Sequence, residues 1–215
     1  MKYIILADET KIHEGVTLYR IQALKDFSDV KSGDKGGWIE KESNLAQCDN
    51  AWVYDNAIVY GDAEVCGDAI VYGEAIICGK ARVCGDTRVY GDAKVCGDTM
   101  VYGNAKVCGE AKVYGDAEVC GNAIVCSNAE VCGDAIVYGK ARVYGDAIVC
   151  GDAEVYDNAR VYDDAIVCGN AKVYGDAVVC GDAWLSGTAI VYSKAKVAES
   201  ECKKWYDDNK GEGTK

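Results

Sequence analysis

The sequence AIVYGKARVYGD at residues 135–146 contains two copies of a six-residue repeat that runs without insertion or deletion through residues 51–197. One position of the repeat is Val in every copy except at Ile77 and Leu185, and the position two residues before it is Ala in almost every copy. A short fixed period predicts a solenoid, in which each repeat buries its apolar side chains against its neighbours. The repeat therefore indicates the architecture of most of this chain.

Within each copy, the segment Ala-x-Val-Tyr/Cys predicts a short strand, and the following Gly-Asp/Asn predicts a turn. Because side chains alternate across a strand, Ala and Val share one face, and the x and Tyr/Cys positions share the other. The x position accepts Glu, Lys, Arg, Ile and Trp, so we expect Ala and Val inside and the other two positions outside. Three such strands and turns close a triangular coil, and about eight coils stacked at roughly 4.8 Å form a rod about 40 Å long.

Phrases such as VYGEA at residues 71–75 and VCGDA at residues 149–153 resemble the hexapeptide repeat of left-handed parallel β-helix proteins. The resemblance implies an all-β, single-stranded, left-handed parallel β-helix of about eight triangular coils of eighteen residues. The segment DVKSGDKGGWIE at residues 29–40 resembles the start of uncharacterised bacterial and prophage hexapeptide-repeat proteins. Those proteins are variously labelled transferases or polymer-forming proteins, so this second resemblance leaves the activity open.

The ends of the chain differ from the repeat, and we expect three parts. Residues 1–44 are predicted to form an N-terminal β-hairpin and entry cap, with strands at 2–6 and 16–24. Residues 45–197 form the β-helix, and residues 198–215 are predicted to form a short C-terminal capping helix and a disordered tail. Caps are needed because an open coil end exposes unpaired strand edges and a bare core.

The composition restricts the partners and the cellular compartment that we expect. The formal net charge of −12 argues against nucleic acid and anionic membranes as partners. The apolar patch at residues 4–6 is far too short for a secretion signal or a membrane span, so a cytoplasmic protein with free thiols is predicted. The Cys columns that begin at Cys48 and Cys132 offer soft-metal ligands, but no Cys-x-x-Cys element accompanies them. We expect neither a bound metal nor a cofactor.

Residues eighteen positions apart lie above one another in such a rod, so each outer face can be written as columns. We define the first, second and third faces as those whose x positions begin at Trp52, Ile58 and Glu64. The first face carries a basic column, and its candidate contact residues are Arg88, Arg142 and Arg160. The second face carries two apolar clusters, and its candidate interface residues are Ile58, Ile76, Ile148, Ile166 and Trp184. Exposed apolar clusters of this kind usually mark an interface.

An acidic column is predicted at the corner between the second and third faces. Like charges at this spacing repel one another, so the column is a candidate site for a cation or a basic partner. It consists of Asp98, Asp116, Asp134 and Asp152.

Many left-handed β-helix proteins are trimeric acyltransferases that use a His on the coils as general base, so the resemblance implies this activity. The only His in this chain, His13, is expected in the hairpin turn, far from the coils. The repeat offers no other catalytic residue, which favours a non-catalytic scaffold or protein-interaction solenoid. We expect it to assemble laterally as a dimer or trimer, or to bind another protein. Two alternatives stay open: an acyltransferase-like enzyme, and an acidic nucleic-acid mimic that inhibits a prophage or host defence system.

Overall fold

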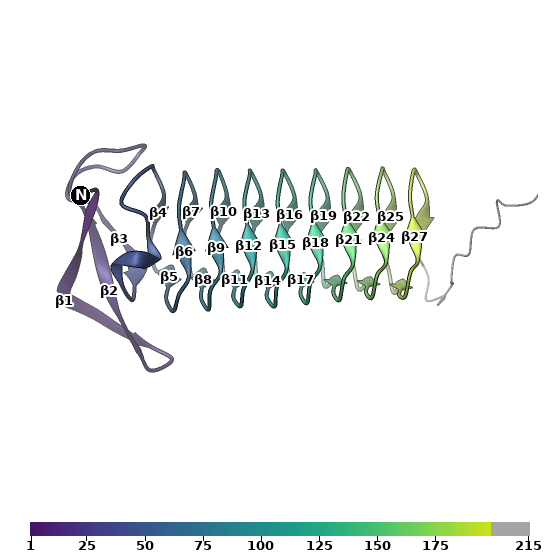
Figure 1. Cartoon of the computed structure of the whole chain (residues 1–215), viewed down its shortest axis with the longest axis horizontal. Coiled ribbons are helices and arrows are strands. Elements are labelled where there is room, and N and C mark those ends of the chain that lie inside the picture. Colours follow the sequence, from purple (N-terminus) through teal and green to yellow (C-terminus); the bar gives the residue numbers. More distant parts are fainter. Residues whose placement is uncertain (199–215) are drawn as a thin grey trace, which may run out of the picture.

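The computed structural model describes residues 1–198, which form a rod of stacked β-coils with a wider cap at the N-terminal end (Figure 1). The strands of the coils pair in parallel, so the predicted all-β parallel solenoid is confirmed. The predicted C-terminal helix and tail lie, apart from Ala198, outside the described residues.

Three sheets form the sides of the rod, and each coil contributes one two-residue strand to each of them. The first sheet contains β4 (Trp52–Val53), β7 (Ile70–Val71), β10 (Arg88–Val89), β13 (Lys106–Val107), β16 (Ile124–Val125), β19 (Arg142–Val143), β22 (Arg160–Val161), β25 (Val178–Val179) and β28 (Lys196–Val197). The third sheet contains β6 (Glu64–Val65), β9 (Arg82–Val83), β12 (Met100–Val101), β15 (Glu118–Val119), β18 (Ile136–Val137), β21 (Glu154–Val155), β24 (Lys172–Val173) and β27 (Ile190–Val191).

The second sheet is the largest because the N-terminal strands extend it. Its coil strands are β5 (Ile58–Val59), β8 (Ile76–Ile77), β11 (Lys94–Val95), β14 (Lys112–Val113), β17 (Glu130–Val131), β20 (Ile148–Val149), β23 (Ile166–Val167) and β26 (Trp184–Leu185). Its N-terminal strands are β1 (Tyr3–His13), β2 (Val16–Ala23) and β3 (Lys35–Ile39), and the short 3₁₀ helix η1 (Glu42–Asn44) follows them.

The core is the predicted column of Val and Ala. The Val side chains of the coils are fully buried as far as Val179, while the x positions outside them are half-buried or exposed along most of the rod. Thr87 and Thr99 replace Ala at two inward positions, and both are fully buried. Neither hydroxyl has a hydrogen-bond partner, so the core contains two unsatisfied polar groups. Leaving such groups buried costs free energy, because they lose their hydrogen bonds to water on folding.

The corners explain why Gly recurs at one position of the repeat. Gly97 has φ of +85°, and a Cβ atom there would lie 2.6 Å from the carbonyl oxygen of Gly115 in the next coil. Both the left-handed backbone and the close approach of two coils therefore favour Gly. Three of the exceptions at this position are Asp residues, and their carboxylates accept hydrogen bonds from backbone N–H groups one coil further on. The pairs are Asp55–Gly73, Asp157–Gly175 and Asp163–Gly181.

The N-terminal cap is built on the predicted hairpin. Strands β1 and β2 pair antiparallel, with a bulge between Leu6 and Thr10, and β1 continues well beyond the predicted residues 2–6. Strand β3 pairs antiparallel with β2 and parallel with β5, so it joins the hairpin to the coils. This arrangement covers the strand edge at the N-terminal end of the second sheet.

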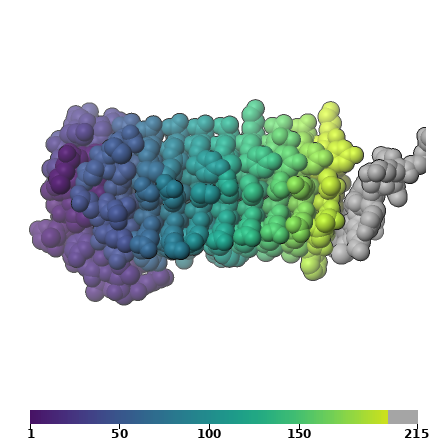
Figure 2. Space-filling model, viewed as in Figure 1, coloured from purple at the N-terminus to yellow at the C-terminus, as the bar shows by residue number. Residues whose placement is uncertain are grey.

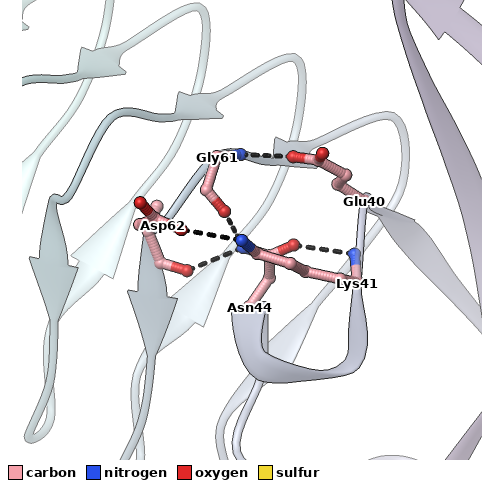
Figure 3. A network of polar contacts seen from close by, with 6 residues as sticks. Glu40, Lys41, Asn44, Gly61 and Asp62 are labelled. Atoms are coloured by element: carbon pink, nitrogen blue, oxygen red, sulfur yellow. Dashed lines mark hydrogen bonds and ion pairs between the residues drawn. The ribbon is translucent and has the colours of Figure 1, made fainter.

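A polar network fastens η1 to the first coil, as Figure 3 shows. The Asn44 side chain donates hydrogen bonds to the carbonyl oxygens of Gly61 and Ala63, at 3.0 and 2.8 Å. The Lys41 ammonium lies 2.7 Å from the Asp62 carboxylate, and Glu40 accepts a hydrogen bond of 2.6 Å from the Gly61 N–H. Asn44 is fully buried, so its amide satisfies carbonyl groups that the first coil would otherwise leave without partners.

The open end of the core is closed by Lys2 and a group of aromatic rings. Lys2 is only 1% exposed, and its ammonium donates hydrogen bonds to the carbonyl oxygens of Ala51 and Cys48, at 2.7 and 3.3 Å. Burial lowers the pKa of Lys2 to about 8. Trp52 packs edge-on against Tyr3 and Phe27 and is buried, so the first position of the first face belongs to the core of the cap instead.

Candidate interaction surfaces

The N-terminal hairpin covers the beginning of the second face. Its turn reaches the coils, where the His13 ring lies 5.6 Å from the Tyr60 ring, and Tyr60 donates a hydrogen bond of 2.9 Å to Glu14. Lys11 and Arg20 lie over the Trp38 ring, at 5.9 and 5.0 Å. The prediction that His13 lies far from the coils is therefore wrong, because the turn of the long hairpin reaches the first coil.

This covering also changes the predicted interface. Ile58 is only 4% exposed, so it is not available as an outer contact residue. Ile76, one coil further on, is half-buried. Figure 2 shows the N-terminal residues standing out from the side of the otherwise even rod. Of the first apolar cluster, Ile58 is thus an internal residue, whereas Ile76 remains partly exposed.

The second apolar cluster remains on the surface. Ile148, Ile166 and Trp184 lie on the neighbouring strands β20, β23 and β26, in register. The two Ile side chains are half-buried, and Trp184 is 53% exposed. The indole N–H of Trp184 donates a hydrogen bond of 3.2 Å to the sulfur of Cys168. We call these three residues the apolar strip.

The basic column on the first face is exposed. Arg142 and Arg160 are adjacent in register on β19 and β22, and Arg88 lies nearer the cap on β10. None of the three takes part in an ion pair within residues 1–198. The Tyr rings beside them stack on one another along the rod, as in the Tyr144–Tyr162 pair at 4.9 Å.

The acidic column lies at the corner after the second sheet, and all four of its carboxylates are exposed. Asp98 is 3.3 Å from the ammonium of Lys80, which precedes it in the same column. Asp116, Asp134 and Asp152 form no ion pair within the described part of the chain. The rod therefore presents an acidic column, unpaired at Asp116, Asp134 and Asp152, on one side and an unpaired basic column on another.

An open groove of about 600 Å³, which the repeat pattern does not predict, runs along the corner between the third and first faces. One wall is a column of turn residues, Asn50, Asp68, Asp86, Asn104 and Asn122, and the other wall includes Arg88 and Lys106. Asp29 and Tyr54 close the end near the cap, joined by a hydrogen bond of 2.6 Å. Burial and the Asp29 carboxylate raise the pKa of Tyr54. The groove could not be predicted because the loop before β3, which carries Asp29, closes one end of it, and no repeat pattern predicts the position of that loop.

Four of the Cys residues are joined in disulfides, which contradicts the expectation of free thiols at these positions. Cys66 pairs with Cys84 on the third face, and Cys78 pairs with Cys96 on the second. Both pairs join neighbouring coils with a Cα–Cα distance of 4.6 Å, which lies inside the range that a disulfide spans. The in-register stacking of a short repeat is the physical reason. The other Cys residues of the described chain are free, namely Cys48, Cys108, Cys120, Cys126, Cys132, Cys150, Cys168 and Cys180.

Within residues 1–198, no group of three or more His, Cys, Asp or Glu side chains is arranged to hold a metal ion. In the same range, no helix is long and apolar enough to cross a membrane. The predicted contact residues instead fall on two separate surfaces, the basic column and the acidic corner with the apolar strip beside it.

Comparison with known proteins returns short matches to one group. A family model described as the YdcK β-solenoid repeat matches residues 153–169. A protein of Escherichia coli (strain K12) named "Uncharacterized acetyltransferase YdcK" is 50% identical over 54 residues, which is 25% of this chain and 16% of the relative. The matched segment thus spans less than a fifth of the length of that relative. The six-residue repeat, the parallel solenoid and these two matches fit a hexapeptide-repeat β-solenoid superfamily.

Proposed function

We propose that this chain is a non-catalytic interaction solenoid whose rods associate side by side with further copies of the same chain. The observation that carries the proposal is the pair of exposed, largely unpaired charged columns described above. Each coil passes through the first, second and third sheets in order, so the corner between the second and third sheets lies opposite the first face. The acidic column is therefore on the opposite side of the rod from the basic column.

The two columns also lie at matching heights. Arg88 and Asp98 belong to the same coil, and so do Arg142 and Asp152. Two rods with parallel axes can place the acidic corner of one against the basic face of the next without a shift along the axis. A contact between two different surfaces is heterologous, and because these two lie on opposite sides of the rod, its repetition gives an open row of parallel rods.

The apolar strip supports the same contact. Ile148, Ile166 and Trp184 lie on the second face, directly beside the corner that carries Asp134 and Asp152. A partner that covers the acidic corner therefore also covers apolar side chains that are now partly exposed. Burial of apolar area supplies affinity, and the charged columns supply the register and the choice of partner.

Charge reversal with a compensating swap tests this proposal. The molar mass of the full chain is measured by analytical ultracentrifugation at increasing protein concentration for the wild type and for Arg88→Glu/Arg142→Glu. The reversal should dissociate the oligomer, and the added changes Asp98→Arg/Asp152→Arg should restore it, because each reversed residue then faces a residue of opposite charge at the same height. Arg82→Glu, an exposed reversal on the third face, is the matched control and should leave the mass unchanged.

Two results would refute the proposal. A wild-type chain that stays monomeric at high micromolar concentration would exclude self-association. A reversal variant that dissociates but is not restored by the swap would show that the two columns do not contact each other.

Acetyl transfer is a second candidate, favoured by the name of the E. coli relative. The only His of the chain packs against Tyr60 at the turn of the hairpin, and its Nε2 is buried without a hydrogen-bond partner. Release of coenzyme A from acetyl-CoA, measured by chromatography with amine and hydroxyl acceptors, tests this candidate. Turnover by the wild type that is lost in a folded His13→Ala variant would overturn the non-catalytic proposal.

A further inference from the structure

Three free thiols lie one above another on the second face, in the same column as the Cys78–Cys96 disulfide. Cys132, Cys150 and Cys168 follow the neighbouring strands β17, β20 and β23, whose residues pair in register. The Cys132 N–H donates to the carbonyl oxygen of Val149, and the Cys150 N–H donates to that of Val167, each at 2.9 Å. All three side chains are half-buried and remain open to solvent on one side.

The spacing of this column suits a bond between either pair of neighbours but not between its ends. Cys78 and Cys96 occupy the same column, three and two coils before Cys132, and their Cα atoms are 4.6 Å apart in a disulfide. Cys132 and Cys168 are separated by two coil heights, roughly 10 Å at the usual strand spacing. Two Cys residues whose Cα atoms are more than about 7 Å apart cannot form a disulfide without backbone movement. Cys150 is therefore the shared partner of both possible bonds.

We propose that Cys132, Cys150 and Cys168 form a thiol–disulfide exchange site that accepts low-molecular-weight disulfides and passes the resulting disulfide along the rod. Cys168 is the entry residue because it ends the column and because the Trp184 indole N–H, 3.2 Å from its sulfur, holds that sulfur in place. Burial and the two neighbouring thiols raise the pKa of Cys150 to about 11, so the central thiol stays protonated until a neighbour has been oxidised.

The reaction balances in three steps. The Cys168 thiolate attacks one sulfur of a disulfide RSSR, forms a Cys168–SR mixed disulfide and releases RS⁻, which takes up a proton. Cys150, after losing its proton to solvent, attacks the Cys168 sulfur, so that a Cys150–Cys168 disulfide forms and the second RS⁻ leaves. The two thiols are oxidised and RSSR is reduced to two RSH.

In the third step the Cys132 thiolate attacks the Cys150 sulfur, which forms Cys132–Cys150 and releases Cys168 as a thiolate without further oxidation. The attacking sulfur must approach along the axis of the bond that breaks. The stacked column places Cys132 on the far side of Cys150 from Cys168, along the rod axis, which is the approach that this step needs. The third thiol is thus what distinguishes this column from an ordinary pair such as Cys108 and Cys126, which also lie in register.

Peptide mapping of the full chain tests the proposal. The reduced protein is treated with oxidised glutathione, its remaining thiols are alkylated, and the disulfides are mapped by mass spectrometry after digestion with trypsin and a Glu-specific protease. Cleavage at Glu130, Lys140, Arg142, Glu154, Arg160 and Lys172 separates the three Cys residues into different peptides. The Cys108–Cys126 pair serves as the internal control, because its oxidation shows that the reagent reached the protein.

The wild type should yield both Cys150–Cys168 and Cys132–Cys150, with the first appearing earlier. Cys132→Ser should retain only Cys150–Cys168, Cys168→Ser only Cys132–Cys150, and Cys150→Ser neither. Trp184→Phe should slow the first oxidation several-fold without changing the final pairing. These outward Ser substitutions leave the core untouched, and circular dichroism checks the fold of each variant.

Three results would overturn the proposal. A Cys132–Cys168 disulfide in folded Cys150→Ser would show that the coils do not hold the spacing described here. A wild type that forms one pair and never the other would exclude exchange, and this measurement needs no variant. A column that stays reduced while Cys108–Cys126 is oxidised would exclude the site altogether.

Discussion

Replacement of Thr99 by Val should stabilise this protein, although most substitutions in a protein core destabilise it. Thr99 is fully buried between Ala81 and Ala117, the residues at the same position one coil before and one coil after it. Its hydroxyl has no hydrogen-bond partner. Val has almost the same shape as Thr, so Thr99→Val removes the hydroxyl without opening a cavity.

The size of the effect follows from the hydroxyl alone. A buried polar group without a partner costs about 1–3 kcal/mol, so the free energy of unfolding should rise by about 1–2 kcal/mol in Thr99→Val. Thr188→Val makes the same chemical change at an exposed turn and should alter stability by less than about 0.5 kcal/mol. Thr99→Ala should gain less than Thr99→Val, because it also removes a buried methyl group worth roughly 0.8 kcal/mol.

Urea denaturation followed by circular dichroism provides the measurement. The midpoint should rise for Thr99→Val with no change in the slope, because the surface exposed on unfolding stays the same. A midpoint that falls, or that moves no more than in Thr188→Val, would refute the reasoning. Such a result would mean that the hydroxyl has a partner in the folded chain.

Three further predictions follow from the corners, the apolar strip and the cap. Gly97→Ala should lower the free energy of unfolding by at least about 1 kcal/mol more than Gly187→Ala. Both residues have positive φ, but of the two only a Cβ at Gly97 would meet another coil among the described residues, 2.6 Å from the Gly115 carbonyl oxygen. Equal urea midpoints would contradict this. Ile148→Lys/Ile166→Lys should dissociate the oligomer while the circular dichroism spectrum stays unchanged. If this variant keeps the wild-type mass in ultracentrifugation, the apolar strip is not part of the interface. Folded Lys2 loses its proton near pH 8 and unfolded Lys2 near pH 10.5, so between these values the unfolded state binds more protons and the free energy of unfolding rises with pH. The melting temperature of the wild type should therefore rise relative to that of Lys2→Met between pH 7.5 and pH 10. A difference between the two melting temperatures that stays constant would show that Lys2 has an ordinary pKa.

Which side chains of the coils face inward and which face outward could be predicted from the sequence, because every copy of the repeat has the same alternating pattern. Val and Ala recur at positions that alternate with variable residues, and the structure buries the former along the rod. The hexad also implies which residues stack, so the columns of Arg88, Arg142 and Arg160 and of Asp98 to Asp152 follow from counting. The residue types of the strands and turns and the six-residue spacing of the apolar positions indicate the same structure, which is why the fold was predictable.

What the cap covers could not be predicted, because it depends on contacts between distant segments. Trp52 and Ile58 occupy x positions like any other, yet the loop before β3 and the hairpin bury them. The approach of His13 to Tyr60 depends on the length and curvature of β1, which no periodic pattern encodes. The disulfides were missed for a different reason: the column of Cys66 and Cys84 was recognised, but the compartment was used to infer their redox state.

The equivalence of the three sheets has a consequence for how this molecule changes over evolutionary time. Because the inward residues are the same on every side, gain or loss of one six-residue copy leaves the packing of the interior unchanged. Every outer column beyond that point nevertheless moves to the next side of the rod, since one copy is a third of a coil. A single duplication of eighteen nucleotides can thus cut a charged column in two and join each half to a new neighbour. In this fold, the number of copies therefore determines which side chains share a column on the surface.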